Sequence, residues 1–179
     1  MKEEMVSHLL ANQLITKDQH GFLSKKSVTS QLLECTNDWT KCIADQKPFD
    51  IVYLDFSKAF DSVSHTKLLQ KLSSYGFSGL LLSWLKAFLW RRKQRVLVGD
   101  AYSDYADVVS GVPQGSVLGP ILFLLCVDDI IDMLNTHVGT NAKLKLFADD
   151  VKLYSSVPIN GNHSDANLLL ESVCTWARK

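Results

Sequence analysis

The stretch FDIVYLDFSKAFD, residues 49–61, decides how the rest of this chain is organised. It follows Pro48 and contains a short apolar run, 51–54, rich in β-branched and aromatic residues, which predicts a buried strand. Asp55 stands at the carboxyl end of that strand. A carboxylate in this position costs free energy unless a partner compensates for it, and a divalent metal ion is one such partner. The alternative is that Asp55 starts a turn or caps the next helix, and this stretch alone leaves both interpretations open.

A second acidic stretch, LKLFADDVKLY at residues 144–154, strengthens the metal interpretation. Apolar residues alternate on both sides of Asp149 and Asp150, which predicts a β-hairpin with the two acids at its tip. Asp-Asp is ordinary turn chemistry, but a tight hairpin turn usually contains glycine and this one does not. Two adjacent acids repel each other, and a third acid nearby would increase the repulsion. Such a cluster favours one or two divalent cations, which take oxygen ligands.

Length and composition limit the possible classes of protein. A chain of 179 residues can bury a sizeable core and is expected to form one domain. The 19 basic and 19 acidic residues give a formal net charge of zero, so any nucleic-acid-binding surface must be local. The four cysteines show no metal-binding spacing and are expected to be reduced thiols of an intracellular protein. No targeting signal is visible, and the longest apolar run, 121–127, is too short to cross a bilayer.

Apolar residues at helical spacing and turn residues predict the other elements. Helices are expected over residues 3–14, 27–46, 65–76 and 78–90, with Ser27 as an N-cap and Gly76 as a terminator. Strands are expected over 95–99 and 106–109, joined by a polar, aromatic turn. We assign His65, in the first turn of its helix, a structural role.

Two basic segments are candidates for binding an anion. QHGFLSKKS at 19–27 is expected to be a loop or short hairpin whose Lys25 and Lys26 would meet an anionic ligand, although a solvated basic turn is the commoner outcome. RRKQR at 91–95 is the densest basic cluster in the chain. It fits a phosphate-binding surface or a solvated helix end, where cations suit the helix dipole.

The segment SGVPQGSVLGP, residues 110–120, contains three glycines and two prolines and leads directly into an apolar run. Pro120 fits the first turn of a helix that should be buried, because the run is apolar on all sides. Glycines before a helix let the backbone approach a ligand closely. The spacing of a Walker motif is absent. The segment is therefore either a ligand-binding loop or a loop that needs tight turns.

Together, residues 55–61, 110–116 and 147–150 resemble motifs A, B and C of reverse transcriptases. With QHGF at 19–22 upstream, the chain is similar to non-LTR (LINE-type) retrotransposons of the jockey and chicken-repeat kind, over nearly its whole length. The resemblance implies an α+β fold. It would be the palm of a right-hand polymerase, an antiparallel sheet with packed helices, plus part of the fingers. Residues 1–48 would belong to the fingers and residues 49–179 mostly to the palm, with intervening helices and a basic hairpin.

The resemblance also implies a metal site. Asp55 and Asp149 would hold two Mg²⁺ (or Mn²⁺) ions, with Asp150 as a third ligand. The backbone carbonyl of Phe56 would also face a metal. One ion would activate the 3′-hydroxyl of the primer and the other would hold the incoming triphosphate.

The rest of motif A would form the nucleotide site. Ser57, Lys58 and Ala59 would lie beneath the triphosphate. Phe60 corresponds to the steric gate of the family, whose ring excludes a 2′-hydroxyl and so selects deoxynucleotides. From the residues alone, Phe60 would be assigned to the core as an ordinary buried aromatic.

Other segments would complete the contacts with substrate. Gln114 would lie against the incoming nucleotide and template base, and Gly115 would let the backbone come close. Family members often carry Arg after the Gly-Phe pair, whereas this chain has Leu23, so Lys25 or Lys26 is expected to substitute. The residues expected to track a nucleic-acid backbone are Arg91, Arg92, Lys93 and Arg95.

The activity that the resemblance implies is RNA-directed DNA synthesis, with an RNA template, a DNA primer and deoxynucleoside triphosphates as partners and no membrane. The protein would be intracellular, and nuclear when functional. Residues 175–179 resemble the start of the motif D helix, so the thumb is expected to be missing. An alternative is therefore a catalytically silent, nucleic-acid-binding remnant of a decayed retroelement. A third hypothesis is a Mg²⁺-dependent phosphotransferase with Asp55 as nucleophile, which would need no Gln114 loop.

Overall fold

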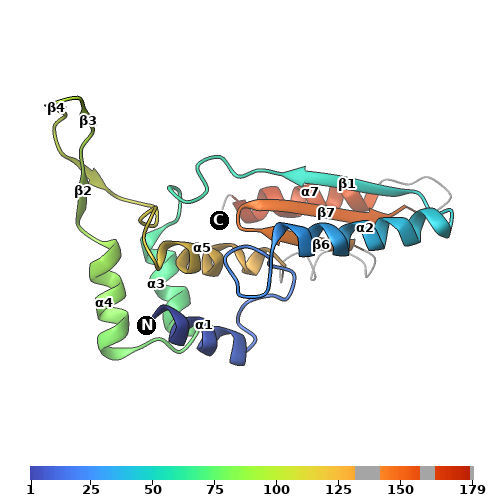
Figure 1. Cartoon of the computed structure of the whole chain (residues 1–179), viewed down its shortest axis with the longest axis horizontal. Helices are drawn as coiled ribbons and strands as arrows, with labels where there is room; N and C mark the ends of the chain where they lie inside the picture. Colours follow the sequence, from blue (N-terminus) through green and yellow to red (C-terminus); the bar gives the residue numbers. More distant parts are fainter. Residues whose placement is uncertain (132–141, 158–163, 178–179) are drawn as a thin grey trace. The chain divides into compact units, whose positions relative to one another are not determined.

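The computed structural model describes residues 1–131, 142–157 and 164–177, which form a mixed α/β structure with antiparallel sheets (Figure 1). The predicted α+β class is therefore confirmed. The chain forms two compact units that alternate along the sequence. The first unit comprises Met1–Leu14 and Lys58–Cys126, and the second comprises Ile15–Ser57 and Val127–Lys179. The predicted division into finger and palm portions at residue 48 stays a prediction.

The second unit is built on a three-stranded antiparallel sheet. Its strands are β1 (Phe49–Leu54), β6 (Ala142–Phe147) and β7 (Asp150–Ser156). The order is β1-β7-β6, so β7 is central and pairs both with its sequence neighbour and with a strand roughly 100 residues earlier. This confirms the predicted strand before Asp55 and the predicted hairpin around Asp149. The strand is not buried as predicted, because among the described strands β1 pairs on one side only, with β7, and its residues are partly or fully exposed.

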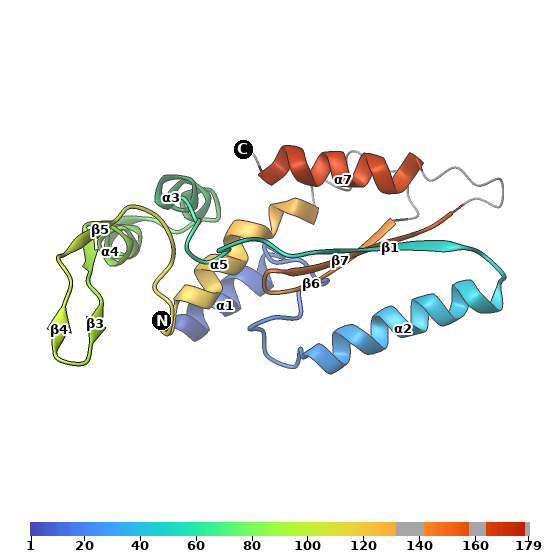
Figure 2. The same ribbon diagram turned by 90° about the horizontal axis from the view of Figure 1, so that it is seen from above.

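Two helices cover opposite faces of this sheet (Figure 2). They are α2 (Val28–Ala44) and α7 (Ser164–Ala177). Ser27 caps α2 as predicted, because its side chain accepts a hydrogen bond from the backbone N–H of Ser30 while the Ser30 side chain accepts one from the N–H of Ser27. Arg178 and Lys179, at the end of the predicted motif D segment, lie outside the described residues.

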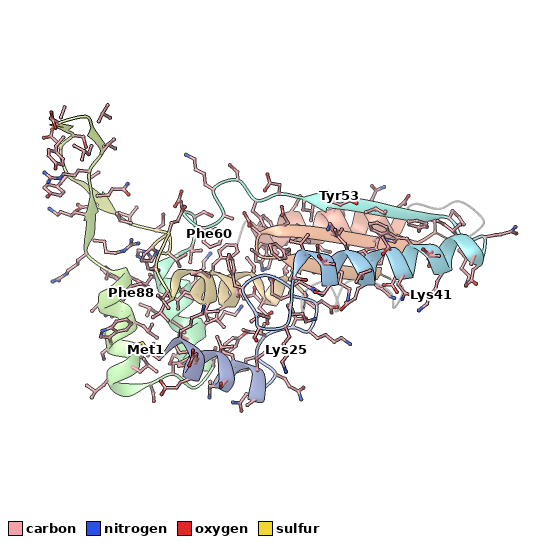
Figure 3. All side chains as sticks on the ribbon, viewed as in Figure 1. Met1, Lys25, Lys41, Tyr53, Phe60 and Phe88 are labelled. Carbon is pink, nitrogen blue, oxygen red and sulfur yellow. The ribbon has the colours of Figure 1, made fainter. Side chains whose placement is uncertain are left out.

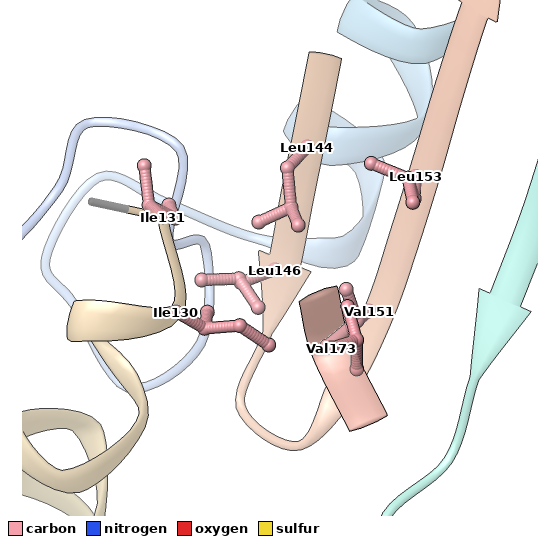
Figure 4. Packing of buried hydrophobic residues seen from close by; sticks show 7 residues of the cluster. All are labelled: Ile130, Ile131, Leu144, Leu146, Val151, Leu153 and Val173. Atoms are coloured by element: carbon pink, nitrogen blue, oxygen red, sulfur yellow. The ribbon is translucent and has the colours of Figure 1, made fainter. Parts of the chain in front are cut away.

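The sheet face toward α7 is apolar. Figure 4 shows its buried cluster, which consists of Ile130, Ile131, Leu144, Leu146, Val151, Leu153 and Val173. Val173 is contributed by α7, and the four residues from 144 to 153 are contributed by β6 and β7. Every second residue of each strand therefore faces this cluster, as period-two alternation requires.

The sheet face toward α2 is polar, although the helix covers it. The contacts are Lys145 Nζ with Asp18 Oδ1 (2.6 Å) and Glu34 Oε2 (2.5 Å), Lys152 Nζ with Gln31 Oε1 (2.7 Å), and Tyr154 Oη with Asp38 Oδ2 (2.7 Å). The polar side chains of the alternating pattern therefore form hydrogen bonds with side chains of α2 and of the segment before it, and not with solvent alone.

The first unit is mainly helical. It contains α1 (Lys2–Ala11), α3 (His65–Ser74), α4 (Gly79–Leu89) and α5 (Gly119–Val127), whose last residue falls in the second unit. Gly76 follows the end of α3 with φ +89°, which confirms its predicted role as a terminator. His8 Nε2 of α1 donates a 2.8 Å hydrogen bond to the Tyr75 carbonyl, and the His8 ring packs edge-on against Phe77, so α1 is fixed beside the end of α3.

The predicted strands at 95–99 and 106–109 differ from the observed ones. The observed pairs are β2 (Arg92–Gln94) with β5 (Ala106–Val108) and β3 (Leu97–Val98) with β4 (Ala101–Tyr102). The ladder breaks between these pairs because the Ser103 hydroxyl, and not a backbone carbonyl, accepts from the N–H of Val96 (2.9 Å). The Arg95 guanidinium lies over the Tyr102 ring, 3.8 Å from its centroid, which stabilises this irregular part.

None of the helices within the described ranges is long and apolar enough to cross a membrane.

Candidate functional site

The turn between β6 and β7 carries the acidic pair. Phe147 pairs with Asp150, so Ala148 and Asp149 form a two-residue connection. Ala148 is buried and adopts φ +55°, a left-handed conformation that is uncommon for a residue with a side chain. Asp149 is half-buried in the turn, and Asp150 is exposed at the first position of β7. The structure thus places both acids at the end of the hairpin, as predicted.

Asp55 lies at the same end of the sheet. Leu54, the last residue of β1, pairs with Val151, which directly follows Asp150. Asp55 is exposed and continues the chain beyond that pair. The ring of Phe56 packs against Trp176 of α7, with ring centroids 5.5 Å apart. The register of β1 on β7 therefore brings together acids that are about 95 residues apart in the sequence.

The donor chemistry of this end of the sheet fits a hard divalent cation. Three carboxylates and a nearby backbone carbonyl are oxygen ligands of the kind that Mg²⁺ and Mn²⁺ take. In the part of the chain that the structure describes, no three or more His, Cys, Asp or Glu side chains are close enough to hold a metal ion together. Asp55, Asp149 and Asp150 share one end of the sheet without closing around a common point.

The segment before α2 contacts the acidic turn. The N–H of Leu146 donates to the Asp18 carbonyl (2.9 Å), and the N–H of His20 donates to the Leu146 carbonyl (2.8 Å). Between them, Gln19 is 1% exposed, and its Oε1 accepts from the backbone N–H of Ala148 (2.9 Å). No feature of the local sequence pattern points to Gln19. The structure shows how tightly this segment packs, because a Cβ added at Gly21 would overlap the backbone nitrogen of Ala148.

A network of charged groups holds the same segment. Burial lowers the pKa of the Lys145 ammonium, but the hydrogen bonds that it donates to Asp18 and Glu34 outweigh burial, so the net pKa is raised. The hydrogen bond from Lys145 also lowers the pKa of Glu34. His20 is buried, and burial followed by the charge of Lys26 lowers its pKa. Lys145 is therefore charged and His20 neutral near pH 7.

In the first unit, hydrogen bonds join the glycine-rich loop, residues 110–120, to the last residues of motif A. Gln114 Nε2 donates to Asp61 Oδ1 (2.8 Å), and the Ser110 hydroxyl donates to the Asp61 carbonyl (2.8 Å). The N–H of Val112 donates to the Phe60 carbonyl (3.0 Å). The structure thus brings the predicted nucleotide residues Phe60 and Gln114 together through Asp61, to which sequence analysis assigned no role.

Gly111 makes this close approach possible. Its φ is +86°, and a Cβ built on it would lie 2.8 Å from Cα of Asp61. Gly115 also has a positive φ, +76°, but a Cβ there would meet nothing within 4 Å. The tight fit at Gly111 explains why the loop has glycine there, and the place of Gly115 beside a ligand stays a prediction.

Phe60, labelled in Figure 3, is half-buried. Its ring stacks on that of Phe123, with centroids 4.1 Å apart and planes 17° apart. The stacking fits the core-aromatic alternative, and the steric-gate role stays a prediction. Lys58 is exposed with φ +51°, and Ala59 is buried. Ser57, exposed, is the last residue of the second unit before the chain passes to the first.

Some of the predicted basic residues are exposed, and others are hydrogen-bonded within the fold. Lys25 is exposed (Figure 3), whereas Lys26 donates to the Lys17 carbonyl (2.8 Å). Arg92 donates to the carbonyls of Leu89 (3.1 Å) and Gly111 (2.9 Å), and burial lowers its pKa. Arg92 therefore stabilises the fold by bonding backbone carbonyls.

The other basic residues of the hairpin are open to solvent. Arg91 and Lys93 are exposed and help to line a cavity of about 640 Å³ together with Trp90 and Asp107. Lys93 Nζ lies 3.9 Å from Asp107 Oδ1. Arg95 lies between two tyrosine rings. This hairpin surface joins cations with aromatic rings, a combination that suits nucleic acid.

The whole chain, residues 1–179, matches the family model described as reverse transcriptase (RNA-dependent DNA polymerase). The chain therefore belongs to the reverse transcriptase family.

Its relatives come from mobile elements. The chain is 29% identical over 170 residues to the "Probable RNA-directed DNA polymerase from transposon BS" of Drosophila melanogaster, covering 93% of this chain and 19% of that protein. It is 31% identical over 190 residues to the RNA-directed DNA polymerase from mobile element jockey of the same species, covering 97% of this chain and 20% of that protein. The chain spans about a fifth of the length of the curated relatives it matches. The predicted resemblance to non-LTR retrotransposon reverse transcriptases is confirmed.

Proposed function

We propose that this chain carries the catalytic site of an RNA-directed DNA polymerase that extends a DNA primer on an RNA template by a two-metal mechanism. One observation carries the proposal. In a chain of the reverse transcriptase family, the register of β1 on β7 brings Asp55 to the same sheet end as Asp149 and Asp150. The three-stranded sheet with α7 would belong to the palm, and residues 1–48, which include α2, would contribute to the fingers.

Asp55 and Asp149 would hold two Mg²⁺ (or Mn²⁺) ions, with Asp150 and the Phe56 carbonyl as further ligands. Bound there, the ions would lower the pKa of the primer 3′-hydroxyl and stabilise the charge that develops on the attacking and leaving oxygens. The carboxylates would fix where the reacting oxygens meet. The buried turn at Ala148 would hold Asp149 in place, because a positive-φ turn has few alternative conformations.

The nucleotide would be positioned by residues of motifs A and B. Ser57, Lys58 and Ala59 would lie beneath the triphosphate. Gln114, held by Asp61, would contact the nucleotide and the template base, with Gly115 allowing close backbone approach. Phe60, fixed by its stacking on Phe123, would exclude a 2′-hydroxyl. Lys25 is better placed than Lys26 to replace the missing Arg, because Lys26 is bonded within the fold.

Primer extension by the purified chain tests the proposal. The assay contains an RNA template, a DNA primer, deoxynucleotides and Mg²⁺ or Mn²⁺. We expect metal-dependent incorporation that falls by at least about 100-fold in Asp55→Asn and Asp149→Asn, since each change removes a charged ligand of the reacting centre. Asp45→Asn is the control, because Asp45 is paired with Lys47 in an exposed position.

The outcomes separate the two functions considered for the chain. Full activity in Asp149→Asn would contradict the proposed site. Salt-sensitive binding of nucleic acid without incorporation by the unaltered chain would instead support the silent binding remnant.

A further inference from the structure

A buried glutamine is bonded directly to the backbone of the turn that carries Asp149. Gln19 Oε1 accepts two hydrogen bonds, from the N–H of Ala148 (2.9 Å) and from the N–H of Gly21 (2.7 Å). Its Nε2 donates a longer one to the Ala148 carbonyl (3.5 Å). One side-chain amide thus meets both backbone polar groups of the residue that precedes Asp149.

The turn needs such a partner for two reasons. Ala148 has φ +55°, which costs a residue with a Cβ about 1 kcal/mol. Its backbone N–H lies outside the β6–β7 ladder and is buried, and a buried N–H without a partner costs about 1–3 kcal/mol. Gln19 satisfies this N–H only while Ala148 keeps the observed conformation. The hydrogen bond therefore selects one geometry of the turn.

Gln19 is itself held in place. Asp18 and His20, on either side of it, are hydrogen-bonded through their backbones to Leu146 of β6. Lys145, the next residue back along β6, binds the Asp18 carboxylate at 2.6 Å. Gly21 packs so closely on Ala148 that no side chain fits there. These contacts fix the backbone on both sides of Gln19, so its side-chain amide can hold the turn in one position.

We propose that Gln19 is a positioning residue that sets the place of the Asp149 carboxylate by clamping the backbone of Ala148. The inference rests on the proposed function, in which Asp149 is a metal ligand. Gln19 makes no contact with the metal in this role. It acts through Ala148, as outer-shell groups act on the ligands of metal sites.

The test compares three variants of residues 1–179. Gln19→Leu removes the acceptor at similar volume. Gln19→Glu keeps an oxygen that reaches both N–H groups. Gln31→Leu is the matched control, because Gln31 is equally buried and binds Lys152 on the same face of the sheet but does not touch the turn. The measurements are Mn²⁺ affinity by electron paramagnetic resonance and hydrogen exchange of the Ala148 amide by NMR.

We expect Gln19→Leu to weaken Mn²⁺ binding by about 10-fold and to speed exchange at Ala148, in line with changes to other outer-shell groups. Gln19→Glu should keep the slow exchange at Ala148, because its oxygen still accepts from that N–H, and Gln31→Leu should change neither measurement. If Gln19→Leu does not fold, Gln19→Asn replaces it. Its shorter amide keeps the polarity and does not reach the turn.

Two results would overturn the inference. The first is unchanged Mn²⁺ affinity and unchanged Ala148 exchange in Gln19→Leu. The second is an equal loss in Gln31→Leu, which would reveal a general effect of removing a buried amide. Asp149→Asn separates this failure from failure of the proposed function. If that variant binds Mn²⁺ as the unaltered chain does, the metal assignment itself is wrong and the role of Gln19 falls with it.

Discussion

At the scale of single residues, His20 shows how burial gives an ordinary side chain a measurable pH signature. Its ring is fully buried, its Nδ1 lies 2.8 Å from the Ser30 hydroxyl, and its Nε2 lies 3.6 Å from Glu34. Burial and the nearby charges of Lys26 and Lys145 lower its pKa, against the opposing effect of Glu34 and Asp18. The folded state therefore binds a proton at His20 less readily than the unfolded chain does.

This difference predicts a pH-dependent stability. The neutral, buried His20 ring contributes to the free energy of unfolding. This contribution is fully present above the unfolded pKa of 6.5, and it is lost as pH falls from there through the lower pKa of the folded state. The melting temperature should therefore fall between pH 7 and pH 5. The fall should be smaller in His20→Gln, which cannot titrate and keeps a group that bonds Ser30. Thermal unfolding followed by circular dichroism measures both. An identical slope in the two proteins would show that His20 does not carry the effect.

The sequence pattern located the acids of the proposed site but not the residues that hold the turn and the loop around it. The position of Asp55 and Asp149 at one end of the sheet was predictable, because each acid follows directly on a strand pattern, whereas their role as metal ligands stays a prediction. Asp61 and Gln19 were not predictable, because the groups they bind are 53 and 129 residues away in the sequence. Spacing reports neighbours on one element, and it carries no information about a hydrogen bond that only the folded backbone creates.

At the scale of elements, period-two alternation predicted the hairpin around Asp149 but not what covers it. Lys145 and Lys152 occupy the polar positions of β6 and β7, which single-sequence reasoning assigns to solvent. The helix α2 brings Glu34 and Gln31 to these lysines instead. Alternation fixes which residues share a face of a strand. Whether that face meets water depends on another element, and the sequence of the strand does not encode it.

The loop of motif B gives a prediction at the same scale. Gly111→Ala should lower the free energy of unfolding by about 2–4 kcal/mol, because a Cβ there combines a positive φ with overlap against Asp61. Gly115→Ala is the matched control. It has a similar φ but open space, so only the conformational cost of about 1 kcal/mol applies. Urea unfolding measures both variants, and equal losses would contradict the packing argument.

At the scale of the whole molecule, a net charge of zero means that affinity for nucleic acid must come from particular side chains. On the hairpin, Arg91 and Lys93 are exposed while Arg92 is bonded to two backbone carbonyls. Arg91→Ala and Lys93→Ala should each weaken binding of an RNA–DNA duplex and reduce the slope of log affinity against log salt by about one. Fluorescence anisotropy at several salt concentrations measures the slope.

Arg92→Ala should behave differently, with its main effect on stability because it loses internal hydrogen bonds. Lys47→Ala, a change at an exposed lysine paired with Asp45, should leave the slope unaltered. A slope that is insensitive to Arg91 and Lys93 would place the nucleic-acid surface elsewhere.

The alternation of the chain between two compact units could not be predicted from length or composition. No shift in composition marks the passages near residues 14, 57 and 126. What defines the units is which helices and strands pack together, and that is settled by contacts between distant segments. The α+β class was predictable because the three motifs shared with reverse transcriptases imply it.

The pairing of β1 with β7 also determines when the sheet can form during translation. β1 leaves the ribosome roughly 100 residues before its partner, which at about 5–20 residues per second is a wait of roughly 5–20 seconds. During that interval Ile51, Val52 and Leu54 belong to an unpaired apolar strand, the kind of segment that aggregates or recruits chaperones. The acids of the proposed site therefore meet only after β7 has been synthesised, so a ribosome that stalls before β7 would release a chain that cannot assemble it.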